Sequence, residues 1–362
     1  MVDNLYIHIP FCRKKCDYCA FFSVTDNSLG DKFLAKLISD IARTADLYGK
    51  KFKTLYIGGG TPTLLTEKQL EMLFAGLERY LDLKSFEEIS IETNPESLNR
   101  EKLAIVEAYV NRISMGVQSF NENLRKILGR DCSNTSIYRA IELIGESKIK
   151  NFNIDLIYAI PAQTIKDFEY DINEVKKAGA KHLSCYNLTI EEQTRLAGKN
   201  IKIDEDSALE LYNVAVSNGF FKQYEVSNYA ISEEFQCRHN KNIWQGGTLL
   251  GLGPAASSFD GEKRFTQSSS IENYLADKGV EYDIISFEER RNEIFAINLR
   301  TCMGWSRAEF EKLYPNAFDL YLQKVAELSL QYPQAFDYSL NHIRLTAEGL
   351  LFWDTIAMEI LG

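Results

Sequence analysis

Three cysteines lie within eight residues near the start of the chain, at Cys12, Cys16 and Cys19, with the spacing C-x3-C-x2-C. Thiolates on one short loop can hold three corners of an iron–sulfur cube or ligate a zinc ion. Structural zinc sites usually have four protein ligands, and the remaining cysteines of this chain are isolated. A [4Fe–4S] cluster with three cysteine ligands leaves one iron open to an outside ligand. The spacing therefore favours an iron–sulfur cluster, with zinc and no metal as alternatives.

Other residues able to bind a small molecule stand where predicted strands end. The segment GGGTP at residues 58–62 follows one strand, and glycine lets a backbone approach a ligand closely. Glu92, Gln118 and Asp155 stand at the ends of three others. Taken singly, such residues more often form caps or turns, so a binding site is indicated only by their joint position.

The elements that must position these residues alternate in type. Six short runs with strand character begin near Leu5, Thr54, Glu88, Arg112, Phe152 and His182. Helical periodicity fills the stretches 32–48, 67–81, 100–110, 136–147 and 167–179. This alternation predicts an α/β fold, a partial (β/α)6 parallel barrel over residues 1–195. The strand ends that collect the polar residues are then the expected place for chemistry.

The rest of the chain has a different pattern. Residues 196–285 form a connecting segment whose middle is rich in Gly, Asn and Ser, and it contains an HNxxxW motif at residues 239–244. Residues 286–362 are mainly helical, with a hairpin predicted at 337–346, and resemble a winged helix. With 7 basic and 11 acidic side chains, this C-terminal module is expected to pack or cover a substrate rather than bind DNA.

The overall charge limits the kinds of molecule that the chain is expected to bind. The chain has 41 basic and 51 acidic side chains, a net charge of −10, which argues against non-specific nucleic-acid binding. It shows neither a secretory signal nor an apolar stretch of the ~20 residues that a membrane span needs. We therefore expect a cytoplasmic protein without a transmembrane segment, for which peripheral membrane contact stays open.

The cysteine motif, with Tyr18 before its last cysteine, resembles that of the radical S-adenosylmethionine (SAM) superfamily. The resemblance implies a [4Fe–4S] cluster whose open iron binds the methionine part of SAM, and a one-electron cleavage of SAM to a deoxyadenosyl radical. The SAM contacts that it implies are Tyr6, Tyr18, Gly59, Gly60, Thr61, Glu92, Gln118, Arg130 and Asp155.

A series of further segments resembles one branch, which contains oxygen-independent coproporphyrinogen III oxidase and the HemW-type heme chaperones. In chain order the segments are IETNPE, SMGVQSF, LGR, NIDLIYAIP, SCYNLTIE, CRHNKNIW and GLGPAASSF. Two departures favour the chaperone. Phe21 occupies the position of the oxidase's fourth cysteine, and the first predicted strand begins at Leu5, which leaves no room for the oxidase's N-terminal extension.

The HNxxxW motif resembles the H-N-x-x-Y-W motif associated with heme binding in those chaperones. The resemblance implies that His239, Asn240 and Trp244 bind heme, and histidine is a natural axial ligand for heme iron. Ile243 replaces the usual Tyr, and Ser257 stands where a histidine is often found. The plainer alternative is that the motif caps a strand end.

The resulting prediction is a radical SAM protein that binds heme and transfers it to an acceptor such as a respiratory hemoprotein. The first alternative is an enzyme that oxidatively decarboxylates the propionates of coproporphyrinogen III to give protoporphyrinogen IX. The second is a non-catalytic protein in which the cysteines form a zinc knuckle. Whether the chain is an enzyme stays open at this stage.

Overall fold

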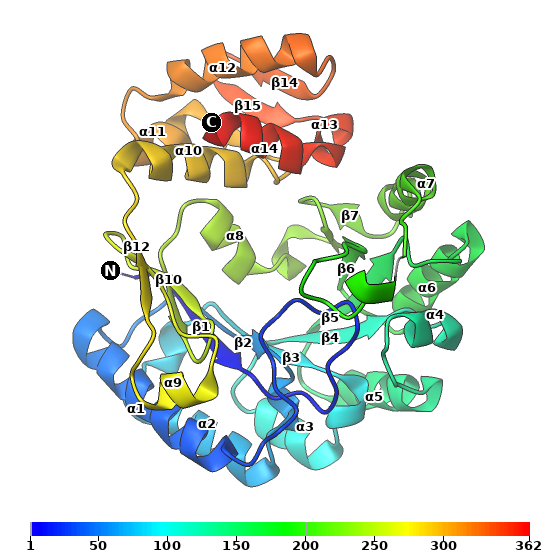
Figure 1. Ribbon diagram of the computed structural model, residues 1–362, viewed down its shortest axis with the longest axis vertical. Helices are drawn as coiled ribbons and strands as arrows, with labels where there is room; N and C mark the ends of the chain where they lie inside the picture. Colours follow the sequence, from blue (N-terminus) through cyan, green and yellow to red (C-terminus); the bar gives the residue numbers. More distant parts are fainter. Residues whose placement is uncertain (1, 200) are drawn as a thin grey trace.

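The computed structural model describes residues 2–199 and 201–362 (Figure 1). The first strands are β1 (Asn4–Ile9), β2 (Thr54–Gly59), β3 (Glu88–Thr93), β4 (Arg112–Gln118), β5 (Asn151–Tyr158) and β6 (His182–Asn187). The helices among them are α1 (Gly30–Tyr48), α2 (Glu67–Tyr80), α3 (Arg100–Val106), α4 (Glu122–Ile127), α5 (Asn134–Glu146) and α6 (Ile165–Lys177). The predicted alternation of strand and helix is confirmed.

The connecting segment adds further strands to this sheet. Its sequence gives no indication of these strands. Its elements are α7 (Glu205–Val216), β7 (Lys222–Gln223), β8 (Asn228–Ala230), α8 (Arg238–Trp244), β9 (Leu249–Leu252), β10 (Ser257–Phe259), β11 (Arg264–Thr266), α9 (Ile271–Leu275) and β12 (Glu281–Asp283). The strands have only two to four residues, too few for a periodic signal. The HNxxxW motif lies in helix α8, and the Arg238 and His239 amides donate to the Glu88 carboxylate at the start of β3. These contacts at a strand end agree with the plainer alternative for the motif.

One sheet contains all strands from β1 to β12, in the order β12-β11-β10-β9-β1-β2-β3-β4-β5-β6-β8-β7. Strands β1 to β6 are parallel to one another, β9 runs parallel to β1 on its other side, and β8 is antiparallel to β6. Within the described residues no pairing joins β12 to β7, so the barrel is open. The predicted partial barrel is thereby confirmed.

The two faces of the strands differ in polarity. Leu5 and Ile7 are fully buried in the apolar core between the sheet and its outer helices. Tyr6 and His8 alternate with them and therefore lie on the concave face, where Tyr6 stacks on Tyr56. A side chain such as leucine contributes about 1.5–3 kcal/mol when it is buried, so the outer face stabilises the fold. The concave face is free to hold polar residues.

Helix α2 illustrates how local sequence places the outer helices. The Thr66 hydroxyl accepts a hydrogen bond from the Gln69 amide, and the Gln69 side chain accepts one from the Thr66 amide, which together form a capping box. Leu70, Leu73 and Leu77 recur at helical spacing and are buried. The predicted helix at 67–81 is confirmed to within one residue.

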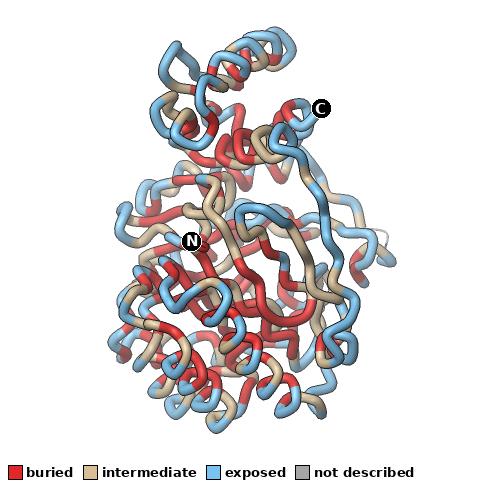
Figure 2. The backbone as a smooth tube through the Cα atoms, turned by 90° about the vertical axis from the view of Figure 1, so that its left-hand side faces the viewer, coloured by how far each residue is buried: buried red, intermediate tan, exposed pale blue. Residues whose placement is uncertain are grey.

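The C-terminal module has an apolar core of its own (Figure 2). It consists of α10 (Phe287–Asn298), β13 (Trp305–Ser306), α11 (Arg307–Leu313), α12 (Phe318–Gln331), β14 (Phe336–Ser339), β15 (His342–Leu345), α13 (Ala347–Leu351) and α14 (Trp353–Leu361). The predicted hairpin is confirmed as β14 and β15. The last two helices, α13 and α14, meet at Phe352, and the Trp353 indole donates to Ala296 O.

The module packs on the barrel through helix α8, which lies between them in Figure 1. Arg300 Nε lies 2.8 Å from Glu225 Oε2, and the Val226 amide donates to Arg300 O. Among residues 2–199 and 201–362, no helix combines the length and apolarity needed to cross a bilayer. The cytoplasmic location stays a prediction.

Candidate cluster and cofactor site

The cysteine loop (residues 10–29) connects β1 to α1. All three of its cysteines are half-buried. Cys12 Sγ lies 3.7 Å from Thr61 Oγ1, and Cys16 Sγ lies 3.8 Å from Arg130 Nη1. The described residues contain no group of three His, Cys, Asp or Glu side chains gathered as for a single metal ion. The structure thus brings Cys12 and Cys16 to the residues predicted to bind SAM.

Backbone hydrogen bonds fix the loop at both of its sides. The Cys12 amide donates to Val24 O at 2.9 Å. The Asp17 amide donates to Leu128 O at 2.9 Å, and the Leu196 amide donates to Asp17 O at 2.8 Å. The middle of the loop is therefore held between the segment after α4 and the segment after β6.

The surroundings of Cys12 and Cys19 favour the neutral form of their thiols. Burial raises the pKa of Cys12 and Cys19, and for Cys12 the hydrogen bond with Thr61 opposes this effect. A metal must displace these protons to bind, because thiolates are the ligands.

The glycine segment packs directly on the cysteine loop. Gly59 has φ +106°, and a Cβ there would lie 2.6 Å from the His8 ring. A Cβ on Gly60 would lie 2.6 Å from Phe11 O. The Gly59 amide donates to Glu92 Oε2 at 3.1 Å, so the segment is tied to the next strand as well. Only glycine fits at these two positions.

Glu92 lies on the concave face of β3. Its Oε1 accepts a hydrogen bond from the Tyr56 hydroxyl at 2.8 Å. Burial raises the pKa of Glu92 to about 7, and the nearby Asp155 carboxylate adds to the rise. The carboxyl group can therefore exist in either protonation state near neutral pH.

We expect Glu92→Gln to stabilise the cofactor-free protein at pH 8 relative to wild type, and to have less effect at pH 5. Because the pKa in the folded state lies above the ordinary 4.5, the folded state binds more protons. Wild type therefore loses stability as pH rises from 4.5 to about 7. Urea unfolding at pH 5, 6, 7 and 8 measures this. The control is Glu71→Gln, at an exposed position on α2, and equal pH profiles for Glu92→Gln and wild type would contradict the prediction.

A chain of hydrogen bonds joins Arg130 to the glycine segment. Arg130 Nη2 donates to Asn94 Oδ1 and to Gly116 O, each at 2.6 Å. Asn94 Nδ2 donates to Thr61 Oγ1 at 2.7 Å. The Nε of Arg130 is buried and has no partner among the described residues. Asn94 was not among the predicted site residues, although it lies in the segment IETNPE.

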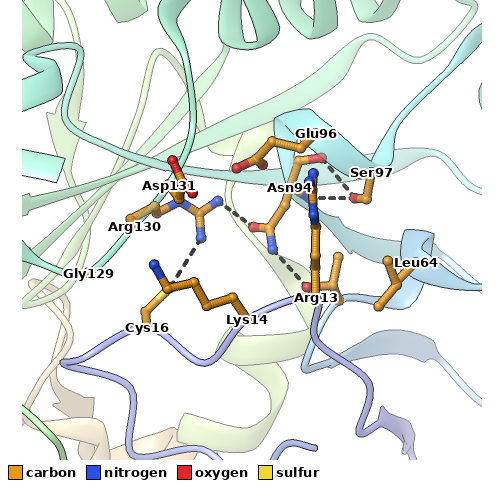
Figure 3. Close-up of a pocket in the computed structure, with 11 residues that line it drawn as sticks. Arg13, Lys14, Cys16, Leu64, Asn94, Glu96, Ser97, Gly129, Arg130 and Asp131 are labelled. Carbon is orange, nitrogen blue, oxygen red and sulfur yellow. Dashed lines mark hydrogen bonds between the residues drawn. The ribbon is translucent and has the colours of Figure 1, made fainter. Parts of the chain in front are cut away.

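A cavity of about 320 Å³ lies beside this chain (Figure 3). It is lined by Arg13, Lys14, Cys16, Thr61, Leu64, Asn94, Glu96, Ser97, Gly129, Arg130 and Asp131. In Figure 3 the guanidinium of Arg130 lies between Cys16 and Asn94. The cavity therefore contains both cationic and anionic side chains beside one of the three cysteines.

The remaining predicted contacts approach the same edge of the sheet. Asp155 Oδ1 accepts from Asn153 Nδ2 at 2.7 Å, and burial raises the pKa of Asp155. Gln118 has φ +73° after a register shift in β4. The Tyr6 hydroxyl lies 3.1 Å from His8 Nδ1, and Tyr18 packs on the apolar cluster of Leu124, Leu128, Ile157, Ile160, Leu188 and Leu196.

We expect Gly129→Ala to lower iron retention and to destabilise the fold. Gly129 has φ +69°, and a Cβ there would lie 2.4 Å from Asp17 Cγ, inside the cysteine loop. A side chain in this backbone region costs about 1 kcal/mol, and the contact would also push the loop away. Iron content after anaerobic reconstitution and the unfolding midpoint measure the two effects.

Gly179→Ala is the matched control. Gly179 also has a positive φ, +74°, but its Cβ would meet nothing within 4 Å. It should therefore show the conformational cost alone and retain its iron. Equal iron content in the two variants would mean that Gly129 does not position the loop.

The heme motif lies at the opposite end of the strands. His239 on α8 is 3% exposed, and its Nδ1 lies 2.7 Å from Thr54 Oγ1. Burial and the Arg112 guanidinium lower the pKa of His239 to about 3. Thr54 is the first residue of β2, whereas the glycine segment begins at that strand's end. The structure therefore does not bring His239 to the cysteine loop.

The other two residues of the motif have different surroundings. Trp244 is buried against Tyr224. The guanidinium carbon of Arg300 lies over the Trp244 ring, 4.8 Å from the ring centroid. Asn240 is half-buried on the same helix. Heme binding by His239, Asn240 and Trp244 stays a prediction.

Known proteins similar to this chain have been found by sequence and by structure. The family model described as "Radical SAM superfamily" matches residues 6–175. "Heme chaperone HemW" of Bacillus subtilis (strain 168) is 31% identical over 100% of both chains, and that of Lactococcus lactis subsp. lactis is 31% identical over 90% of this chain and 89% of the relative.

The structure resembles "Coproporphyrinogen III oxidase (HemN) from Escherichia coli", with a TM-score of 0.84 at 23% identity over 99% of this chain and 90% of the other. This likeness shows the radical SAM fold. The sequence relatives are more similar and match along almost their whole length. The chain therefore belongs to the HemW family of the radical SAM superfamily, and membership in that superfamily implies a [4Fe–4S] cluster and SAM.

Proposed function

We propose that this protein is a heme chaperone, which binds heme and passes it to an acceptor hemoprotein. The observation that supports the proposal most directly is its similarity to the HemW heme chaperone of Bacillus subtilis over both complete chains. Phe21 adds to this, because it stands where the resemblance puts a cysteine in the oxidase.

The cysteine loop fits an iron–sulfur cluster by its donor set. Cys12, Cys16 and Cys19 are the proposed ligands, and no disulfide engages them. The glycine segment packs against the loop so closely that a Cβ at Gly59 or Gly60 would clash. When bound, the cluster and SAM supply one-electron chemistry.

The proposed SAM contacts are those predicted from the sequence: Tyr6, Tyr18, Gly59, Gly60, Thr61, Glu92, Gln118, Arg130 and Asp155. Arg130 suits a carboxylate, since its buried Nε has no partner in the described structure. Glu92 and Asp155 offer half-buried acceptors for ammonium or hydroxyl groups. Arg130 also orients Asn94 toward Thr61, and these hydrogen bonds hold the three side chains together in the site.

Heme binding through His239, Asn240 and Trp244 is part of the proposal. His239 is covered by its own helix and by β2, so a porphyrin can reach the imidazole only if α8 moves. We therefore expect His239→Ala to weaken heme binding only if such a movement occurs.

Anaerobic reconstitution followed by two parallel assays tests the function. One follows hemin binding and its transfer to an apo-hemoprotein, and the other follows protoporphyrinogen IX formed from coproporphyrinogen III. We expect heme transfer without porphyrinogen oxidation. Formation of protoporphyrinogen IX in the second assay would contradict the proposal and support the oxidase alternative. Zinc without acid-labile sulfide would mean that the cysteines bind zinc rather than an iron–sulfur cluster.

A further inference from the structure

Helix α8 carries the heme motif, and the imidazole of that motif is enclosed. His239 is 3% exposed, and its ring packs against Tyr56 with the two ring centroids 5.2 Å apart. A heme iron must reach a ring nitrogen to be ligated, so binding through His239 requires α8 to leave its described position. The contacts that hold α8 in place therefore determine how readily the protein takes up heme.

One buried carboxylate holds the first turn of α8. Glu88, the first residue of β3, is 3% exposed. Its Oε2 accepts a hydrogen bond from the Arg238 amide at 2.9 Å, and its Oε1 accepts one from the His239 amide at 3.2 Å. The Cys237 thiol donates to Oε1 at 3.5 Å. Hydrogen bonds to a charged acceptor are stronger than those between neutral groups, and the low dielectric of a buried site strengthens them further.

The imidazole has a second buried attachment, at the start of β2. His239 Nδ1 lies 2.7 Å from Thr54 Oγ1, and the Thr54 hydroxyl donates its proton to Asn4 Oδ1 at 2.7 Å. Asn4 Nδ2 donates to Thr248 O at 2.9 Å, and a carbonyl only accepts, so the direction of the whole chain is fixed. His239 is therefore the donor to Thr54, and in the neutral ring Nε2 keeps the lone pair that a heme iron needs.

A third polar contact of the first turn lies at the surface. Arg238 Nη1 lies 3.1 Å from Glu87 Oε2, and the two side chains are 50% and 51% exposed. An exposed ion pair contributes little to stability, because water screens the charges. Glu87 and Glu88 are thus adjacent glutamates that both contact α8, and only the contact of Glu88 is buried.

We propose that Glu88 and Thr54 form a latch, whose hydrogen bonds with α8 keep the iron-binding nitrogen of His239 covered until heme is loaded. The inference rests on the proposed heme-chaperone function. The apparent affinity for a ligand is its intrinsic affinity reduced by the fraction of protein in the binding-competent form. Weakening the latch raises that fraction, so it should tighten heme binding rather than abolish it.

Hemin titration of the reconstituted full-length protein, followed by the Soret band, tests the latch. We expect Glu88→Gln and Thr54→Val each to tighten hemin binding at least about tenfold, which corresponds to about 1.4 kcal/mol. Thr54→Ser keeps the hydroxyl group and should restore the affinity of wild type. Glu87→Gln is the matched control, and it should leave the affinity unchanged because it removes only the exposed ion pair.

Hydrogen–deuterium exchange without hemin measures the hold on the helix directly. The amides of Arg238 and His239 donate to Glu88, so exchange across residues 238–244 should be faster in Glu88→Gln than in wild type or Glu87→Gln. Iron content in each preparation shows whether the barrel is folded. If Glu88→Gln does not retain iron, Thr54→Val provides the same test without a change of charge. Exchange equal to that of wild type in both folded latch variants would overturn the inference.

The outcomes of the titration separate the latch from the function on which it rests. If wild type binds no hemin, the proposed function fails and the latch fails with it. If wild type binds hemin and neither latch variant binds it more tightly, the latch is wrong and the proposed function stands. Unchanged hemin affinity in His239→Ala would also overturn the latch, because α8 would then cover no ligand.

Discussion

Replacement of Cys12, Cys16 or Cys19 by alanine is expected to abolish the iron–sulfur cluster. Each residue supplies one of three thiolates, and the cysteine loop contains no fourth. Burial raises the pKa of Cys12 and Cys19, so these two thiols have little tendency to ionise without a cluster. Iron, acid-labile sulfide and visible absorption after anaerobic reconstitution measure the loss.

Cys302→Ala provides the control, because Cys302 is half-buried in the C-terminal module and outside the loop. Its iron content should match that of wild type. Full iron retention in any one of the three loop variants would rule out that residue as a ligand.

Arg130→Ala is expected to weaken SAM binding by roughly ten- to a hundredfold, since a lost charged hydrogen bond costs about 1.5–3 kcal/mol. Asp155→Ala should act in the same direction through a different part of the site. Equilibrium dialysis with SAM measures both affinities. Unchanged affinity in both variants would place SAM elsewhere.

Arg130 also touches the cysteine loop, since its Nη1 lies 3.8 Å from Cys16 Sγ. Iron content must therefore be measured in the same preparation, and we expect it to be retained. Arg100→Ala is the matched loss of charge, at an exposed arginine paired with Glu146. It should leave both iron content and SAM affinity unchanged.

Much of the fold could be predicted because short runs of β-branched and aromatic residues alternate along the chain with stretches of helical periodicity. The predicted starts at Thr54, Glu88, Arg112 and His182 coincide with the starts of β2, β3, β4 and β6. The pairing of β9 with β1 could not be predicted. It joins Leu249 to Asn4 across most of the chain, and a four-residue strand has no local signal for a distant partner.

The site was predictable only in part, for similar reasons. Cysteine spacing and glycine runs are local patterns, so the loop and the glycine segment could be found. Asn94 belongs to the site through side-chain hydrogen bonds with Arg130 and Thr61, and these contacts are not visible in residue order. The environment of His239 depends on Thr54 and Arg112, which belong to other elements.

The interface between the C-terminal module and α8 contains tryptophans whose fluorescence can report on the separation of the two. The guanidinium of Arg300 lies 4.8 Å from the Trp244 ring on α8 and 4.8 Å from the Trp353 ring in the module. Two of the chain's three tryptophans thus share one cation across the interface. Separation of the module from the barrel would expose both indoles to water, so intrinsic fluorescence can follow that motion during heme loading without an attached dye.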